Sequence, residues 1–321
     1  MGNNNECRGR LEHLKKKPHD RPVTPDEMNR MPGRENHAKR TRLGKIFSLG
    51  RGLYQSVLYP EPVHYQERDT GEWREIDNTL IPMTDGAGET YLINRSNDEL
   101  RAEFHNTADA AMVLLENEEG RMVSWQLEDA RDIQPRPVER QCPRHEDCDR
   151  RRDVLDHLDG EVVFEGILPG VDIRCRVQSV SFKDDIIFFT RQSARPLSFL
   201  LSVPDMVPSL KENGDIQIIA PTGDVPFVLP APFMKDSTTE GAFGGVLVTL
   251  APTGERDVWR MTYTPDEVWL DQAQFPVVLD PAVISKKHSS AIEDNFITSY
   301  SPNTVQPYAG VGMKVSYNNG G

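Results

Sequence analysis

Apolar and polar residues alternate along many short stretches of the chain from about Leu53 onward. In the stretch VDIRCRV, the apolar residues Val171, Ile173, Cys175 and Val177 are separated by charged ones. Successive side chains of a β-strand point to opposite faces, so this pattern predicts a strand with one buried and one solvated face. The same alternation predicts strands at Leu197, Phe199, Leu201 and Val203, and at Trp259, Met261 and Tyr263.

Short polar connections that contain glycine join the apolar stretches. They read ENEEGR before Val123, ENGD before Ile216, PTGD at 221–224 and PTGE at 252–255. Connections of this length with glycine are typical of β-hairpin loops. Many short antiparallel strands with little helix predict an all-β fold, built as antiparallel β-sandwich-like modules.

The stretch from Tyr59 to Leu80 combines a histidine, a tryptophan and several carboxylates. Its centre, HYQERDTGEW, predicts a strand, a glycine-containing turn and a second strand, with His64 on the first strand and its ring partly packed. Asp77 and Asn78 indicate a turn that ends the second strand. We expect the carboxylates mainly on the turn and the solvated face: Glu67, Asp69, Glu72 and Glu75.

One short helix is predicted near the end of the β-rich region. The tetrapeptide TPDE at Thr264 precedes VWLDQAQFP, and Pro276 cannot continue a helix. We expect a two-turn helix from Pro265 to about Ala273 that packs Trp269 on a sheet, followed by FPVVLDP as a short buried strand. An earlier TPDE, at Thr24, predicts another short helix with little to bury.

Composition divides the chain into three parts. Residues 1–45 hold twelve Lys and Arg against six Asp and Glu and show no sustained periodicity, so we expect a flexible basic leader. Residues 46–285 form the predicted all-β module, within which 128–160 has 17 charged residues out of 33 and is expected to be a mobile insertion. Residues 286–321 are expected to be a linker and the start of a further β module.

Net charge is −13, and subtracting the +6 of residues 1–45 leaves −19 on the rest, which argues against nucleic acid as the main partner. The sequence contains no run of about 18 apolar residues, so no membrane-spanning helix is predicted. The N-terminus lacks the apolar core of a secretory signal. The spacing of Cys142 and Cys148, with His145 and His157 nearby, fits no common zinc site, so no metal ligands are predicted. These cysteines are expected to be free thiols or a local disulfide.

Strong catalytic motifs are absent from the sequence. There is no phosphate-binding P-loop, no dinucleotide-binding glycine pattern, no HExxH and no GxSxG. The abundant carboxylates are more typical of surfaces and turns than of a glycosidase pair. No catalytic and no cofactor-binding residues are therefore predicted. The NRS sequon at Asn94 is given little weight as a glycosylation site.

Four segments, in this order, resemble the N-terminal region of bacterial wall-associated and Rhs-type surface proteins that contain DNRLRE modules. They read YPEPVHYQERDTGEWREIDNTL, VVFEGILPGVDIRCRVQSVSFKDDIIF, NGDIQIIAPTGDVPFVLPAPFMKDS and DEVWLDQAQFPVVLDP, and span roughly residues 46–285. The tail from Asp294 resembles the opening of a DNRLRE module, a β-sandwich. The resemblance implies a secreted or cell-wall location and a chain that is a fragment.

The sequence-based hypothesis is a non-enzymatic structural or adhesive module whose partners are downstream domains of the same polypeptide. An alternative is binding of cell-wall glycans by the aromatic residues Tyr59, Tyr65 and Trp73, since aromatic rings stack on sugars. A weaker alternative is a hydrolase that cleaves glycans or peptides.

Overall fold

The computed structural model describes most of the chain between residues 33 and 307. The described ranges are 33–50, 53–67, 69–107, 111–138, 155–239, 241–285, 295–298 and 301–307. The chain divides into two compact units, Met1–Ser285 and Lys286–Gly321. Several predictions lie outside the described residues: the leader up to residue 32 with its helix at Thr24, and the segment that holds Cys142, His145 and Cys148.

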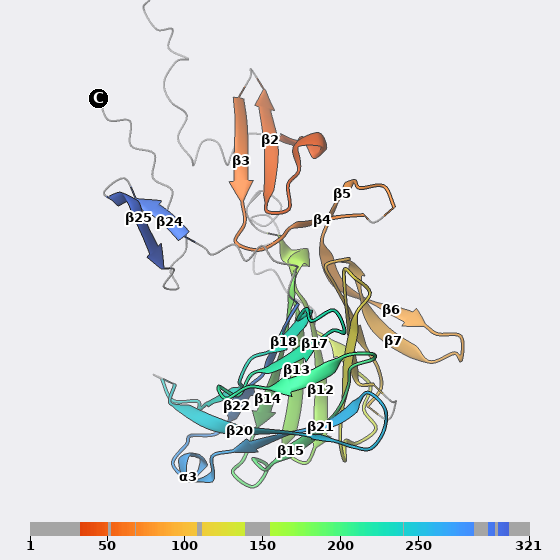
Figure 1. Cartoon of the computed structure of the whole chain (residues 1–321), viewed down its shortest axis with the longest axis vertical. Helices are drawn as coiled ribbons and strands as arrows, with labels where there is room; N and C mark the ends of the chain where they lie inside the picture. Colours follow the sequence, from red (N-terminus) through yellow and green to blue (C-terminus); the bar gives the residue numbers. More distant parts are fainter. Residues whose placement is uncertain are drawn as a thin grey trace, which may run out of the picture. The chain divides into compact units, whose positions relative to one another are not determined.

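Eight antiparallel strands form the first large sheet of unit Met1–Ser285 (Figure 1). In sheet order they are β6 (Asp77–Thr84), β7 (Thr90–Ser96), β8 (Leu100–Phe104), β9 (Val113–Asn117), β10 (Met122–Leu127), β15 (Leu197–Ser202), β21 (Val258–Pro265) and β20 (Phe243–Pro252). Most neighbours in this order are also neighbours in sequence. Hairpins therefore build most of the sheet, as the glycine-containing connections predict.

The second sheet is organised around strand β14 (Ser181–Phe188). One half of β14 pairs with β22 (Val277–Asp280) and the other half with β23 (Ala282–Ser285), on either side of Pro281. The other strands are β11 (Arg136–Pro137), β12 (Gly160–Leu168), β13 (Val171–Val177), β16 (Val207–Leu210), β17 (Ile216–Ile219), β18 (Phe227–Leu229) and β19 (Phe233–Lys235). Because β20 pairs with both β19 and β21, the two sheets join into a closed barrel. The all-β antiparallel fold class is confirmed, with closure into a barrel in place of two separate layers.

Alternating apolar residues fill the barrel as predicted. The four apolar residues of β13 are buried between partly or fully exposed charged ones, and β15 alternates in the same way. Phe182 of β14 is fully buried and meets Phe104 of β8 at a ring distance of 6.1 Å and Trp125 of β10 at 5.2 Å. These three rings join the two sheets.

The predicted turns are also present. The loop before β10 holds Gly120 at a φ of 75°, and the loop before β17 holds Gly214 at 90°. Only glycine adopts this left-handed conformation without steric cost, which explains its place in these connections. The predicted hairpin loops of this region are therefore confirmed.

The helix near the end of the barrel is shorter than predicted. Helix α3 spans Glu267–Leu270, and its N-cap is Asp266, whose carboxylate accepts hydrogen bonds from two backbone amides of the helix. The expected range from Pro265 to Ala273 is wrong because β21 continues through Pro265. Trp269 packs as predicted, against a glycine: a Cβ built on Gly244 would lie 2.4 Å from its indole ring.

A small N-terminal sheet occupies part of the range predicted as a flexible leader. It contains β1 (Arg34–Glu35), β2 (Gly44–Gly50) and β3 (Leu53–Leu58), with a 3₁₀ turn η2 (His37–Lys39) between the first two strands. The leader prediction is therefore wrong for residues 33–45, where backbone pairing with β2 compensates for the weak apolar periodicity. Strands β4 (His64–Gln66) and β5 (Trp73–Glu75) form the predicted hairpin.

Both ends of the predicted mobile insertion, 128–160, are ordered. Thr107 accepts a hydrogen bond from the backbone of Ile133, β11 pairs with β12, and a 3₁₀ turn η3 (Asp156–Leu158) precedes β12. The centre of the insertion, 139–154, lies outside the described residues. The mobile-insertion prediction is thus too broad, because backbone hydrogen bonds secure both flanks.

Unit Lys286–Gly321 contains a two-stranded antiparallel pair, β24 (Asn295–Thr298) and β25 (Ser301–Pro307). Whether this pair begins a DNRLRE module stays a prediction. No helix in the described part of the chain is long and apolar enough to cross a membrane.

Candidate functional site

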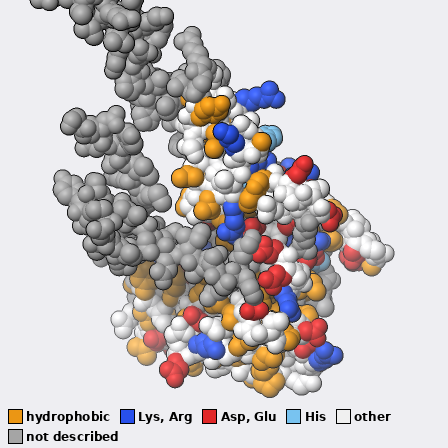
Figure 2. Space-filling model, turned by 45° about the horizontal axis from the view of Figure 1, so that its top comes forward, with side chains coloured by type: hydrophobic (Ala, Val, Ile, Leu, Met, Phe, Trp, Pro, Cys, Tyr) orange, Lys and Arg blue, Asp and Glu red, His pale blue; other side chains and the backbone are white. Residues whose placement is uncertain are grey.

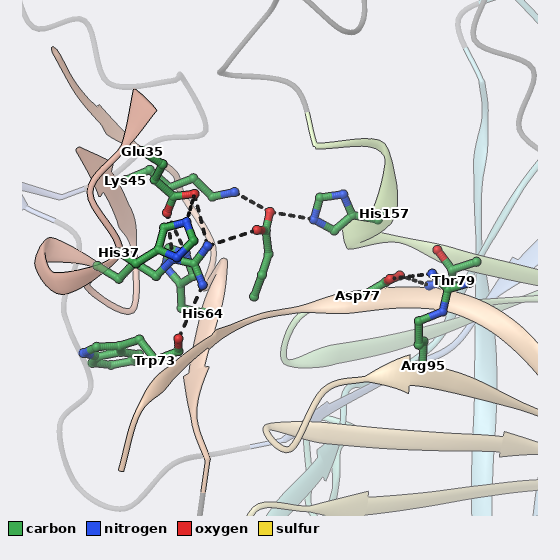
Figure 3. Close-up of polar contacts among 11 residues, drawn as sticks. Glu35, His37, Lys45, His64, Trp73, Asp77, Thr79, Arg95 and His157 are labelled. Atoms are coloured by element: carbon green, nitrogen blue, oxygen red, sulfur yellow. Dashed lines mark hydrogen bonds and ion pairs between the residues drawn. The ribbon is translucent and has the colours of Figure 1, made fainter. Parts of the chain in front are cut away.

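Six charged or titratable side chains gather where the N-terminal sheet, hairpin β4–β5 and turn η3 meet (Figure 3). We call this group the Glu75 cluster. Its members are Glu35, Arg40, Lys45, His64, Glu75 and His157. They come from six elements or their flanks, so only the folded chain brings them together.

Glu75 lies at the centre of the cluster. Its carboxylate accepts a hydrogen bond from His157 Nε2 at 2.9 Å, contacts Lys45 Nζ, and lies 3.5 Å from Arg40 Nη2. Partial burial pushes the pKa of this carboxyl upward, but the bonds from His157 and Lys45 outweigh that effect and lower the pKa to about 2. Glu75 is therefore ionised under all ordinary conditions.

Glu35 forms the second acidic centre of the cluster. Arg40 binds it through two parallel contacts, Nε to Oε1 at 2.7 Å and Nη2 to Oε2 at 3.1 Å. Burial raises the pKa of Glu35, and the hydrogen bonds and charge of Arg40 more than reverse this, so the net shift is downward. The guanidinium also donates to the backbone carbonyl of Trp73, which ties η2 to the hairpin.

His64 is enclosed within the cluster, with none of its surface exposed. Nδ1 donates to the carbonyl oxygen of Thr41 at 2.7 Å, which leaves Nε2 as the unprotonated nitrogen of the neutral ring. In the described part of the chain, Nε2 has no hydrogen-bond partner, and Glu35 Oε1 lies 3.7 Å away. Burial lowers the pKa of His64. The prediction of partial packing understates the enclosure of this ring.

Strand register explains how His64 and Glu75 meet. They are directly opposed cross-strand partners in hairpin β4–β5, so their side chains share a face. Val63 and Ile76, which flank the hairpin, are fully buried and joined by a backbone hydrogen bond. The expectation that the carboxylates of this stretch lie mainly on the turn and the solvated face is wrong for Glu75, because its partners come from other elements.

The charges of the cluster balance at neutral pH. Arg40 and Lys45 supply two positive charges, and Glu35 and Glu75 supply two negative ones. Such a set holds elements together and controls protonation, whereas its cations disfavour a bound metal ion. Among the described residues, no group of three or more His, Cys, Asp or Glu side chains is placed to hold a metal.

A network of buried asparagines lies beside the cluster. Asn78 Oδ1 accepts hydrogen bonds from Asn94 at 2.8 Å and Asn97 at 3.0 Å, and Asn78 Nδ2 donates to the carbonyl of Leu158. Asn97 also donates to the carbonyl of Ser179. The network thus fixes η3, and with it His157, against the barrel.

This network corrects the prediction for Asp77 and Asn78. They begin strand β6 and do not form a turn: Asn78 is fully buried, and Asp77 pairs with Arg95 at 3.1 Å (Figure 3). The residue pair is typical of turns, but here tertiary hydrogen bonds satisfy the buried amide. Asn94 of the sequon is also buried, at 5% exposure, so its side chain does not present a surface acceptor.

The three aromatic residues predicted to contact glycans occupy different environments. Tyr65 is 8% exposed, and its hydroxyl is hydrogen-bonded to Ser96 Oγ at 2.7 Å, so its ring is not a surface platform. Tyr59 and Trp73 are half-buried, and the indole of Trp73 extends away from the Glu75 cluster in Figure 3. Glycan binding by these residues stays a prediction.

An acidic depression of about 250 Å³ lies beside the loop of hairpin β4–β5. It is lined by Glu67, Asp69, Asp98, Arg101, Glu116 and Asn117. A glycosidase requires one carboxyl group with a raised pKa as general acid. Hydrogen bonds from Thr70 and Arg74 instead lower the pKa of Glu67. The hydrolase alternative therefore gains no support from Glu67.

The Glu75 cluster escaped sequence-based prediction, which named no catalytic or binding residue in it. His64 begins the stretch HYQERDTGEW and Glu75 follows its end by two residues. Counting outward from the turn therefore places the two residues opposite each other, and this register was the one usable signal in the sequence. His157 lies 82 residues from Glu75 in sequence. No local pattern links them.

Comparison with known proteins finds no matching family profile but several distant relatives. The chain is 24% identical over 289 residues to a protein named tRNA nuclease WapA from Bacillus subtilis strain 168, a match that covers 88% of this chain and 12% of that protein. It is 23% identical over 273 residues to the tRNA3(Ser)-specific nuclease WapA of Bacillus spizizenii, covering 83% of this chain and 11% of that protein.

A shorter relative matches over most of its own length. The Wall-associated protein of Geobacillus stearothermophilus is 22% identical over 210 residues, which covers 65% of this chain and 77% of that protein. The names of the two longer relatives point to an enzymatic activity and contradict the expectation of a non-enzymatic protein. The chain spans about an eighth of the length of those nucleases and is similar, at low identity, to wall-associated proteins.

Proposed function

We propose that this protein is a wall-associated bacterial surface protein in which the closed β-barrel is a rigid structural module. The observation that carries the proposal is the match to the Geobacillus relative, which is named for wall association and is covered over 77% of its length. A closed barrel suits an extracytoplasmic setting because closure removes the exposed strand edges that promote aggregation.

We extend the proposal to the mode of attachment, as contact with wall glycans through Trp73 and Tyr59. Both rings retain exposed surface, whereas that of Tyr65 does not. Aromatic rings are large and rigid, with an apolar face that suits the C–H face of a sugar ring. The likeness to Rhs-type proteins with DNRLRE modules remains part of this proposal and is tested by the gene sequence that follows the codon for Gly321.

Co-sedimentation with purified bacterial cell walls tests both parts. The 321-residue protein should sediment with walls, and Trp73→Ala should reduce the bound fraction, while Tyr54→Ala, an exposed aromatic of the N-terminal sheet, should leave it unchanged. Wall association is overturned if the native protein sediments no better than serum albumin. Glycan contact by Trp73 is overturned if native protein and Trp73→Ala bind equally.

We propose RNA cleavage as a second candidate function, supported by the relatives named as tRNA nucleases. Cleavage of a phosphodiester benefits from a general acid or base and from cations beside the phosphate. His157 and Lys45 of the Glu75 cluster supply these groups, although Glu75 contacts both. The face in Figure 2 shows basic side chains interspersed with acidic ones, with no continuous basic patch for a long RNA contact.

An assay with unfractionated tRNA tests this candidate. Cleavage by the 321-residue protein that is lost in His157→Gln, and retained in the exposed variant His37→Gln, supports the cluster as its site. Cleavage that survives His157→Gln places the chemistry elsewhere. Intact tRNA after incubation with the native protein overturns the candidate for this chain.

A further inference from the structure

The orphan nitrogen of His64 is the most unusual feature of the Glu75 cluster. The imidazole is fully buried, its Nδ1 is committed to Thr41, and in the described part of the chain Nε2 has no hydrogen-bond partner. A buried polar atom without a partner is costly and rare in folded proteins. A neutral ring tolerates the site, but a second proton would place a charge in an enclosed space.

The charged groups around His64 make a second proton unfavourable. Arg40 and Lys45 repel a positive charge on the ring, whereas Glu35 attracts it but is already bound by Arg40 through Nε and Nη2. The other two members of the cluster are Glu75 from β5 and His157 from η3. The exposed His37 from η2 lies beside Glu35 at the edge of the cluster. With two cations and two carboxylates at neutral pH, each added proton leaves an excess of positive charge.

Charged and hydrogen-bonded side chains of residues 33–76 contact the barrel and turn η3. Glu75 bonds His157 beside β12, and Arg42 forms two bonds to Glu99 at 3.0 and 2.9 Å. Residues 33–76 bury the apolar side chains of Leu49, Val63, Tyr65 and Ile76, and none of these four belongs to the apolar core cluster of the barrel. Separation of these residues therefore leaves that core intact, and the charged contacts weigh heavily in the attachment.

We propose that residues 33–76, which comprise the N-terminal sheet and hairpin β4–β5, form an acid-released cap: protonation of His64 separates this cap from the barrel, and the barrel stays folded. This inference does not depend on wall association or on RNA cleavage. Opening would expose the inward face of the sheet, where Val57 is the cross-strand partner of Lys45.

The direction of the pH effect follows from proton linkage. Because burial lowers the pKa of His64 below its ordinary 6.5, the closed state binds fewer protons than the open state as the pH falls below that value. Acidification therefore favours opening. The lowered pKa of Glu35 and of Glu75 adds to the effect only below 4.5, the ordinary value for a glutamate.

Hydrogen exchange followed by mass spectrometry tests the proposal on the full 321-residue protein. Exchange rates at about pH 7.5 and about pH 5 are compared after correction for the intrinsic pH dependence of amide exchange. Protection of Gly44–Gly50 should fall severalfold on acidification, because the open state binds the additional proton more readily than the closed state. Protection of Ser181–Phe188 in the barrel should not fall.

Two variants assign the effect to the cluster. His64→Asn places an amide nitrogen where Nδ1 donates to Thr41 but cannot gain a proton, so the acid-dependent loss should largely disappear. Should His64→Asn fail to fold, His64→Gln, which likewise cannot gain a proton, should show the same loss of pH dependence. His105→Gln, on a histidine of the barrel that contacts Glu103 and no member of the cluster in the described contacts, is the matched control and should behave as the native protein.

Three outcomes overturn the proposal. In the first, the native cap keeps its protection at both pH values. In the second, cap and barrel lose protection together, which would mean global unfolding. In the third, the folded His64→Asn variant, or His64→Gln in its place, opens with the same pH dependence as the native protein.

Discussion

The barrel and the acid-released cap are stabilised by different physical forces. In the barrel, side chains such as Phe182 are fully buried and pack against aromatic rings of the facing sheet. At the cap, the contact with the barrel includes polar side chains that pair with one another, among them Glu75 with His157 and Arg42 with Glu99. Apolar burial depends on area and hardly on pH, whereas ion pairs change with protonation.

The difference indicates that one chain contains two regions with opposite responses to acid. Asp184 sharpens the contrast, because it is a buried carboxyl in the barrel beside Tyr263 and Pro281. Burial raises its pKa to about 7, and the nearby charges of Asp185 and Asp280 act in the same direction. Acid therefore favours the folded barrel at Asp184 and disfavours the closed cap at His64.

The largest expected effect concerns the apolar core of the barrel. Phe182→Ala should lower the free energy of unfolding of the barrel by about 3–5 kcal/mol, because it removes a buried ring that joins the two sheets. Urea unfolding followed by tryptophan fluorescence measures this change. Phe243→Ala, at a ring that is 64% exposed, is the control and should stay within about 0.5 kcal/mol. Equal losses in the two variants would contradict the assigned core.

The next effect concerns the asparagine network that fixes η3 to the barrel. Asn78→Ala should cost about 1–3 kcal/mol, since the buried amide groups of Asn94 and Asn97 each lose one of their two acceptors. Thermal or urea unfolding measures the cost. Asn213→Ala, in an exposed hairpin loop, should cost far less, and a similar cost at both sites would mean that the network adds no stability.

A third prediction tests the opposite pH response of the barrel. The raised pKa of Asp184 means that its protonated form is favoured in the folded state, so its contribution to stability is lost as the pH rises from 3.8 through about 7. One proton accounts for a slope of at most about 1.4 kcal/mol per pH unit. Asp184→Asn should flatten the dependence of unfolding free energy on pH between about 5 and 8. An unchanged slope would assign the dependence to other groups.

The smallest expected effect concerns an exposed ion pair of the barrel, which is compared with an enclosed one in the cap. Arg256 pairs with Asp205 at 2.8 Å, but their side chains are 82% and 72% exposed, in contrast to the 10% of Arg40 in the cap. Arg256→Gln should therefore change the unfolding free energy by less than about 0.5 kcal/mol. Arg40→Gln should increase hydrogen exchange in the cap much more. If both variants behaved alike, enclosure would not explain the role of the Glu75 cluster.

Local sequence patterns predicted the barrel strands well and the candidate site poorly. The alternation in β13 and β15 is a local property of an extended chain, and glycine at a left-handed turn position is likewise local. Helix α3 begins at Glu267 and not at the predicted Pro265 because Asp266 is its N-cap. Strand β1 and turn η2 fell in the predicted leader because they bury no apolar side chain and therefore show no apolar period.

The sequence by itself determined the all-β class, the hairpin connections and the apolar face of each main strand, because these depend on residues a few positions apart. Only the tertiary structure decided that Asn78 is buried, that His64 is enclosed, and that Glu75 meets His157 from 82 positions away. Those pairings depend on how separate sheets are joined. The same charged residues would be solvated in a different arrangement, so their chemistry is a property of the fold.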